Sequence, residues 1–372
     1  MLTQKMMRTL LGGACLAILG GILVAGLWPF NPWPPNQVKW LDRENGLEFR
    51  PDGIIFTEQP ISMPLSKAEQ AALELWLQPA IDDTAPILCI YKREPHEQFR
   101  VLQYGDTLLL QIERGSDLTA LEIEQVLHPR QNTFVTITSN PQRTAVYING
   151  MLAKASSHFI MTPGNLSGRL VAGAQPLDYD SWGGQLRALA IYDQELTASQ
   201  ALAHYQSWTN GNASGDAPLD LDDAIALYRF DEHQGKLVHS AAASGPTLVI
   251  PRAFSIPEKK FLEPPWTSAR FDWSYFQDIA INIGGFVPLG FFFCAFLDMA
   301  QHPRRLSVSS IAIAIGISMS LIIEILQFYL PTRDSSLMDV ISNSLGTVIG
   351  AILYRFMSTP LQALKRHILR SS

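Results

Sequence analysis

Four long apolar runs stand near the two ends of the chain, at residues 10–27, 279–297, 308–330 and 340–356. Each run is long enough to cross a bilayer core of about 30 Å, because an α-helix rises about 1.5 Å per residue. We therefore predict four membrane-spanning helices. A cleaved signal peptide is the alternative for the first run. We favour an uncleaved anchor, because the run exceeds the apolar core of a typical signal peptide and no small-residue cleavage site follows it.

The segment between the first two runs has a different pattern. Short stretches of alternating apolar and polar residues, such as 72–79, 134–140 and 144–155, are separated by Gly, Pro, Asn and Asp. This pattern is typical of an all-β sandwich. Asn149-Gly150 lies inside one stretch and supplies the positive φ values that a tight hairpin turn requires.

The expected fold class is a multidomain chain that joins a transmembrane helical bundle of about four helices to an extracytoplasmic β-sandwich. The linker is rich in Pro and aromatic residues, and we expect Trp266, Trp273 and Tyr275 to lie at the lipid headgroups. The expected segments are an anchor (1–28), the sandwich (36–255), the linker (256–277), three further membrane helices (278–356) and a basic cytoplasmic tail (357–372).

The distribution of charge indicates how the chain is oriented in the membrane. Only 17% of the residues are charged, below the soluble average of about 25%, and the formal net charge is −6. Lys and Arg near the ends of membrane helices stay in the cytoplasm. They gather in three places: Lys5 and Arg8; Arg304 and Arg305; Arg355, Lys365, Arg366 and Arg370. We expect both termini to be cytoplasmic and the sandwich to be outside.

Cysteine content excludes two further classes. The three cysteines, Cys15, Cys89 and Cys294, provide no disulfide framework and no zinc-binding spacing. The acidic balance also makes nucleic acid an unexpected partner.

Polar side chains recur at the predicted outer ends of the last three membrane runs. They are Asp278, Asn282, Ser320, Glu324, Gln327, Asp339 and Asn343, with Arg333 in the outer loop. Their spacings of three and four residues place each set on one helix face. A charged group at the bilayer centre costs roughly 2.5–3.5 kcal/mol, so we expect the sets to face one another. Arg333 is the expected counter-charge for Glu324 or Asp339.

Two interpretations of this membrane polar cluster remain open. Polar residues can hydrogen-bond helices together, and Asp278 and Asp339 can be helix N-caps at the interface. Alternatively, Glu324 and Asp339 are the candidate catalytic or metal-binding acids. The sequence Gly346-x-x-x-Gly350 predicts a close approach of another helix to the last span.

The same residues carry a family resemblance. The motifs D-I-A-x-N-x-x-x-F-x-P-L-G-F (278–291), S-x-x-x-E-x-x-Q (320–327) and R-x-x-x-x-x-D-x-x-x-N-x-x-G-x-x-x-G (333–350) resemble the VanZ-like membrane family. The resemblance implies a multi-pass protein of the bacterial cell membrane. It also implies a link to cell-envelope or glycopeptide-antibiotic response, because VanZ is associated with resistance to teicoplanin.

The middle segment resembles a second family. The runs AVYINGMLA (145–153) and GGQLRALAIYDQELTASQALAHY (183–205), with ELWLQP upstream, are similar to the concanavalin A-like lectin/glucanase superfamily of LamG type. The resemblance implies a jelly roll that binds glycans or proteins. Enzymatic members carry an E-x-D-x-E motif, which is missing here, since residues 122–124 and 178–180 do not match it. We therefore lean against an enzyme.

Candidate ligand residues in this segment are few. Tyr179 and an exposed Trp182 are candidates for stacking on a sugar ring, although a Trp in such a motif is more often in the core. The possible ligands of a calcium ion are Asp52, Asp178, Asp180 and Asp193. Asp in Gly-rich loops also caps turns, which is the simpler interpretation.

Two functions follow as the main hypotheses, and a transporter or channel is a third that polarity confined to the outer ends of the helices argues against. The first is a membrane protein that displays a glycan- or protein-binding sandwich, with membrane lipids and a cell-wall glycan or envelope protein as partners. The alternative is a membrane-embedded enzyme that acts on a lipid-linked or phospholipid head group through the membrane polar cluster.

Overall fold

A computed structural model of the chain describes residues 4–64, 69–93, 97–177, 179–211, 223–268, 273–299 and 307–370. The chain divides into two compact units. The sandwich unit is Trp33–Glu258, and the membrane unit combines Met1–Pro32 with Lys259–Ser372.

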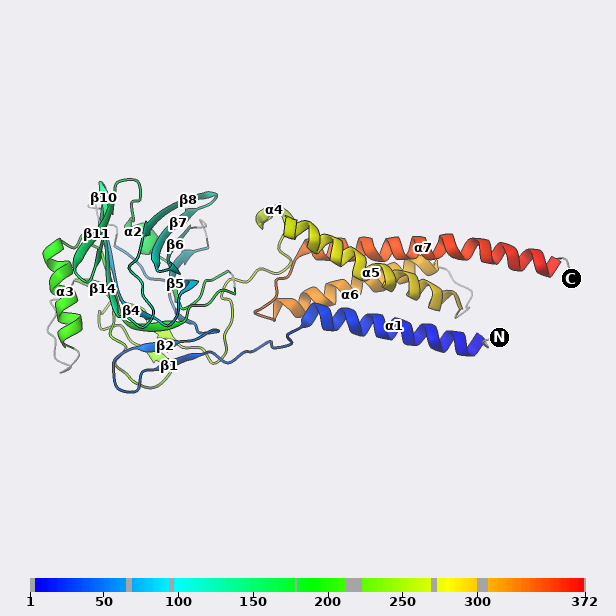
Figure 1. The fold of residues 1–372 in the computed structure, drawn as a ribbon, viewed down its shortest axis with the longest axis horizontal. Helices are drawn as coiled ribbons and strands as arrows, with labels where there is room; N and C mark the ends of the chain where they lie inside the picture. The colour runs from blue at the N-terminus through cyan, green and yellow to red at the C-terminus, as the bar shows by residue number, and fades with distance from the viewer. Residues whose placement is uncertain are drawn as a thin grey trace. The chain divides into compact units, whose positions relative to one another are not determined.

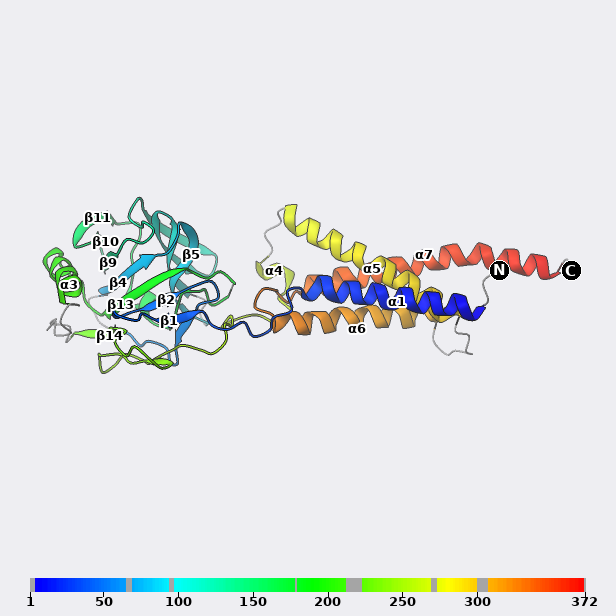
Figure 2. The same cartoon turned by 60° about the horizontal axis from the view of Figure 1, so that its bottom comes forward.

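The sandwich unit contains two antiparallel sheets that face each other (Figures 1 and 2). Sheet I has the order β1 (Val38–Trp40), β2 (Leu47–Phe49), β13 (Gly184–Tyr192), β4 (Ala71–Pro79), β9 (Thr133–Asn140), β10 (Arg143–Ile148) and β11 (Met151–Ser156), with β14 (Ala224–Tyr228) paired to β13. Sheet II has the order β15 (Leu237–Val238), β16 (Leu248–Val249), β3 (Ile55–Thr57), β12 (Arg169–Ala172), β5 (Asp83–Lys92), β6 (Glu97–Gly105), β7 (Thr107–Arg114) and β8 (Asp117–Ile123). The predicted sandwich is confirmed.

The hairpin between β10 and β11 turns where the sequence predicts it. Ile148 pairs with Met151 across the turn, and Asn149 and Gly150 have φ values of 50° and 76°. Both values lie in the left-handed region that a two-residue hairpin requires. The prediction for Asn149-Gly150 is therefore confirmed.

Strand β4 shows how the sandwich is layered. Leu73, Leu75 and Leu77 pack into the core between the sheets, while Ala72 and Trp76 pack on the outer face of sheet I. Helix α3 (Ala198–Gly211) covers that outer face (Figure 1). Because both faces of β4 are covered, the strand is a nearly continuous apolar run.

The membrane unit consists of α1 (Gln4–Leu27), α5 (Trp273–Met299), α6 (Val308–Phe328) and α7 (Leu337–Arg370), which run side by side (Figures 1 and 2). All four are long and apolar enough to cross a membrane. The short helices α2 (Pro163–Leu166) and α4 (Pro265–Ser268) complete the described elements.

Glycines bring α5 and α7 together. A Cβ atom on Gly346 would lie 2.3 Å from the carbonyl oxygen of Ile283, and one on Gly350 would lie 2.1 Å from that of Val287. Any larger residue would force the backbones apart, so the predicted close approach at Gly346-x-x-x-Gly350 is confirmed.

Candidate functional sites in the sandwich and the membrane unit

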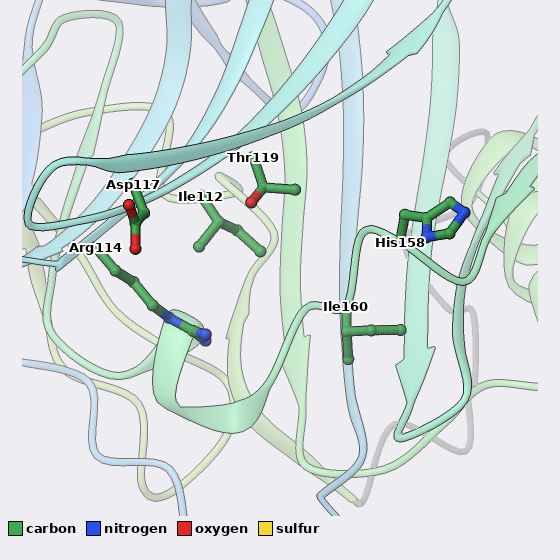
Figure 3. A pocket seen from close by; sticks show the side chains of 6 residues that line it. All are labelled: Ile112, Arg114, Asp117, Thr119, His158 and Ile160. Carbon is green, nitrogen blue, oxygen red and sulfur yellow. The ribbon is translucent and has the colours of Figure 1, made fainter.

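A cavity of about 260 Å³ opens beside the hairpin that joins β7 to β8 (Figure 3). Two cross-strand pairs line one side, Ile112 with Thr119 and Arg114 with Asp117. His158 and Ile160, from the segment after β11, line the other side (Figure 3). The cavity therefore combines two apolar side chains with four polar ones.

Arg114 is oriented by its neighbours and still accessible. Its Nε donates to Glu97 Oε1 at 2.9 Å, and the Asn165 amide donates to the same oxygen at 2.8 Å. The Arg114 side chain is 55% exposed. Arginine, aspartate and histidine can hydrogen-bond the hydroxyls of a sugar, and the two isoleucines can contact its C–H face.

The sequence motifs did not predict this cavity, although a signal is present in β8. Leu121 and Ile123 face the core between the sheets. Asp117 and Thr119 occupy the same face, because side chains alternate along a strand. Polar residues at core-facing positions mark the place where the sandwich opens. His158 and Ile160 gave no such signal, since only the fold brings them there.

The proposed sugar-stacking residues lie elsewhere. Trp182 is only 1% exposed, packs on Phe49 and donates from Nε1 to Gln103 Oε1 at 2.8 Å. The expectation of an exposed Trp182 is wrong, because the ring fills the core. Tyr179 is half-buried, and its hydroxyl donates to Asp52. Burial, with this hydrogen bond, raises the pKa of Tyr179 to about 12.

The four candidate calcium ligands are not gathered among the residues that the structure describes. Asp52 accepts from Tyr179, and Asp180 accepts from Gln175 at 2.9 Å. Asp178 lies outside the described residues. Elsewhere in the described ranges, no group of three or more His, Cys, Asp or Glu side chains is placed to hold a metal. Calcium binding, including a role for Asp193, stays a prediction.

The membrane unit places Glu324 at the centre of its polar residues. The Glu324 side chain is buried, with 1% exposed. The backbone N–H of Ser336 donates to its Oε2 at 2.7 Å, and the Ser335 side chain also hydrogen-bonds it. The turn between α6 and α7 thus folds back onto this carboxylate.

Asp339 lies in the first turn of α7 and interacts electrostatically with Glu324. The Asn282 side chain, from α5, hydrogen-bonds the Asp339 carboxylate. Asp278 precedes Asn282 by one helical turn and is also close enough to interact with Asp339. Asp339 therefore lies within electrostatic range of one acid from each of the other two helices. Asp339 is not the N-cap that the alternative interpretation suggested, because α7 begins at Leu337.

A second polar layer lies one helical turn further in. Asn343 Nδ2 donates to Ser320 Oγ at 2.9 Å, which joins α7 to α6. Gln327 turns away to α1, where its Nε2 donates to the carbonyl oxygen of Gly26 at 2.8 Å.

Arg333 has a different role from the one expected. Its Nε donates to the Trp28 carbonyl oxygen at 3.1 Å, and its Nη2 contacts the carbonyls of Trp28 and Ala25. These carbonyls end α1, where a cation interacts favourably with the helix dipole. The expectation that Arg333 offsets Glu324 or Asp339 is therefore wrong, because its guanidinium holds α1 instead.

Lys259 has a role that the sequence did not indicate. Its Nζ donates to the carbonyls of Gln327 (2.8 Å), Leu330 (2.5 Å) and Arg333 at the end of α6. Burial lowers the pKa of Lys259 to about 8, and the nearby Asp334 opposes this shift. The following backbone also bonds the α6–α7 turn, since Glu263 N–H donates to the Ser335 carbonyl at 2.8 Å. A lysine in a Pro-rich linker gives no signal of such a contact.

Comparison with known families agrees with both sets of motifs. Residues 231–358 match the family model described as VanZ/LLP1, and residues 57–201 match that of the concanavalin A-like lectin/glucanases superfamily. The chain thus carries a concanavalin A-like domain and a C-terminal VanZ domain. None of the curated proteins compared with the chain matches it.

Similar solved structures are distant. A SAP-like pentraxin from Limulus polyphemus is 17% identical, with 60% of this chain and 95% of that chain covered and a TM-score of 0.36. The receptor binding domain of botulinum neurotoxin D is 16% identical, with 45% of each chain covered and a TM-score of 0.37. A proposed carbohydrate binding protein from Bacteroides ovatus is 12% identical, with coverages of 56% and 58% and a TM-score of 0.39. These values support no inference about a ligand.

Proposed function

We propose that this chain, which joins a concanavalin A-like domain to a VanZ domain, is a membrane protein. It displays a glycan- or protein-binding sandwich outside the bacterial cell membrane. The distribution of Lys and Arg at the ends of the apolar helices supports this orientation. Membrane lipids surround the four helices, and a cell-wall glycan or an envelope protein is the partner of the sandwich.

The cavity beside the β7–β8 hairpin is the observation that carries the proposal. Arg114, Asp117, Thr119 and His158 provide donors and acceptors around a space of about 260 Å³, with Ile112 and Ile160 as its apolar part. A glycan hydroxyl can replace water on Arg114 without breaking the bond between Arg114 Nε and Glu97, because the guanidinium has five N–H donors.

The test uses the full chain in lipid nanodiscs on arrays of cell-wall glycans, other polysaccharides and envelope proteins, with calcium and with a chelator. We expect binding to a subset, reduced about ten-fold by Arg114→Ala, since hydrogen bonds to a charged group are worth about 1.5–3 kcal/mol. Arg143→Ala is the matched control, because Arg143 is exposed on β10 of the other sheet. If none of the probes bound, the proposal would be contradicted. If both variants lost binding equally, the cavity would be excluded as the binding site.

The membrane unit supports a second candidate function, an enzyme that acts on a lipid-linked or phospholipid head group. The observation that favours it is the meeting of Glu324 and Asp339 from separate helices, with Asn282 bonded to Asp339. Two neighbouring carboxylates are suited to general acid and base roles. Conversion of labelled envelope lipids should stop in Glu324→Gln and Asp339→Asn. Full activity in both variants would exclude catalysis by these residues.

A role in the response to glycopeptide antibiotics belongs to the same proposal. Deleting the gene in its host should then change the sensitivity of the cells to teicoplanin. Expression of the Glu324→Gln chain should fail to restore the original sensitivity. An unchanged sensitivity on deletion would remove this role.

A further inference from the structure

Three acidic residues lie at the predicted outer end of the membrane unit. Asp278, Glu324 and Asp339 come from three different helices, and Asp339 interacts electrostatically with both of the others. Among the described residues, no Lys or Arg forms an ion pair with any of the three. Arg333 and Lys259, at the same end of the unit, donate to backbone carbonyls. Buried acids in a membrane protein require a proton or a cationic partner.

A buried amide oxygen in the second polar layer also lacks a partner. The Asn343 side chain is 4% exposed, and its Nδ2 is used by Ser320. Its Oδ1 makes no hydrogen bond. Asn343 follows Asp339 by one helical turn on the same face of α7, and Ser320 precedes Glu324 by one turn on α6. Asn343 therefore lies one helical turn below Asp339, and a buried carbonyl oxygen without a donor is rare.

The accessible side of the site lies at headgroup depth. Asp278 is exposed, while Asn282 and Asp339 are half-buried. Exposed aromatic side chains mark the same ends of the helices: Trp273 begins α5, Tyr329 follows α6, and Trp28 follows α1. Tryptophan and tyrosine favour the lipid headgroup region. Asp278 lies five residues after Trp273, or roughly 7.5 Å along the helix axis.

We propose that Asp278, Asn282, Glu324, Asp339 and Asn343 form a site for a primary ammonium group, presented by a lipid headgroup of the outer leaflet. In this outer ammonium site the acids and Asn343 Oδ1 are acceptors, and an ammonium group brings one positive charge and three donors. Its charge compensates the acids, and its depth in the bilayer matches theirs. The inference concerns lipid binding alone and does not depend on glycan binding by the sandwich or on catalysis.

The experiment compares lipids retained by the full chain. Protein extracted from nanodiscs of mixed phosphatidylethanolamine and phosphatidylglycerol is examined by native mass spectrometry. We expect phosphatidylethanolamine to be enriched about ten-fold on the wild-type chain, because charge-assisted hydrogen bonds are the strong ones. Asp339→Asn and Glu324→Gln should each abolish the enrichment.

Asp298→Asn is the matched control, since Asp298 lies at the opposite end of α5 and is bonded by the Tyr354 hydroxyl at 2.8 Å. Its enrichment should equal that of the wild type. A second arm measures thermal unfolding in pure phosphatidylglycerol discs with free ethanolamine, Na⁺ or Mg²⁺ added. Stabilisation by ethanolamine that depends on Asp339 supports the ammonium chemistry and identifies a free amine as sufficient. Equal retention of both lipids without an ethanolamine effect, or Asp339-dependent stabilisation by a metal ion alone, would overturn the proposal.

Discussion

At the scale of single residues, Glu74 is a buried carboxylate of the sandwich with three side-chain partners. The side chain is 1% exposed and lies under α3 on the outer face of sheet I. Its carboxylate accepts from Thr136 Oγ1 at 2.9 Å and Tyr192 OH at 3.0 Å, and it lies 3.0 Å from His204 Nδ1. These bonds connect β4, β9 and β13 to α3, so Glu74 holds the helix on the sheet.

Removing this carboxylate should destabilise the sandwich unit strongly. Glu74→Ala leaves Thr136, Tyr192 and His204 buried without their partner, and we expect a loss of about 3 kcal/mol in the free energy of unfolding. Urea unfolding of the full chain in detergent, followed by tryptophan fluorescence, measures it. Glu48→Ala removes an exposed ion pair with Arg50 and should lower the free energy of unfolding by less than about 0.5 kcal/mol. Equal effects of the two substitutions would show that Glu74 does not hold α3.

Lys259 makes stability depend on pH in a defined direction. Its pKa falls from an ordinary value of 10.5 to about 8 in the folded chain. The unfolded chain therefore binds more protons between about pH 8 and 10.5, so this group makes unfolding harder as pH rises through that window. The difference in melting temperature between wild type and Lys259→Gln should widen with pH there. Lys260→Gln, at a neighbour paired with Glu263, should keep the wild-type slope. A slope unchanged by Lys259→Gln would contradict this role.

At the scale of elements, the sequence predicted what depends on local pattern. The four apolar runs coincide with α1, α5, α6 and α7, and Asn149-Gly150 turns β10 into β11. The sequence could not predict the contacts of Arg333 and Lys259, because each cation has several possible acceptors at similar distances along the chain. Which backbone carbonyls accept these hydrogen bonds depends on how the ends of the helices pack together. The cavity combines residues 112–119 with 158–160, which only sheet pairing and packing bring together.

The contact between α5 and α7 should depend on the absence of side chains. Gly350→Ala places a Cβ atom against the carbonyl of Val287, and we expect a loss of about 1–3 kcal/mol from the forced shift of the helices. Unfolding in mixed detergent micelles, followed by circular dichroism, measures this loss. Gly284→Ala is the control on α5, since its Cβ atom would meet nothing within 4 Å. A Gly350→Ala chain as stable as the control would refute the close contact.

At the scale of the whole molecule, function depends on which side of the membrane each unit faces. The proposed glycan-binding cavity belongs to the sandwich, and the proposed ammonium site belongs to the membrane unit. Both features serve the envelope only if residues 33–258 and the α6–α7 turn lie outside the cell. An even number of spans then returns both termini to the cytoplasm.

Labelling of single cysteines in intact cells tests this orientation directly. Met151 lies on β11 with a side chain that is 71% exposed, and Met357 lies on α7 beside the basic tail. Each is replaced by cysteine in turn. The three native cysteines are buried, so they react little. A membrane-impermeant maleimide should label Met151→Cys in intact cells and Met357→Cys only after lysis. Labelling of Met151→Cys that appears only after lysis would contradict the account.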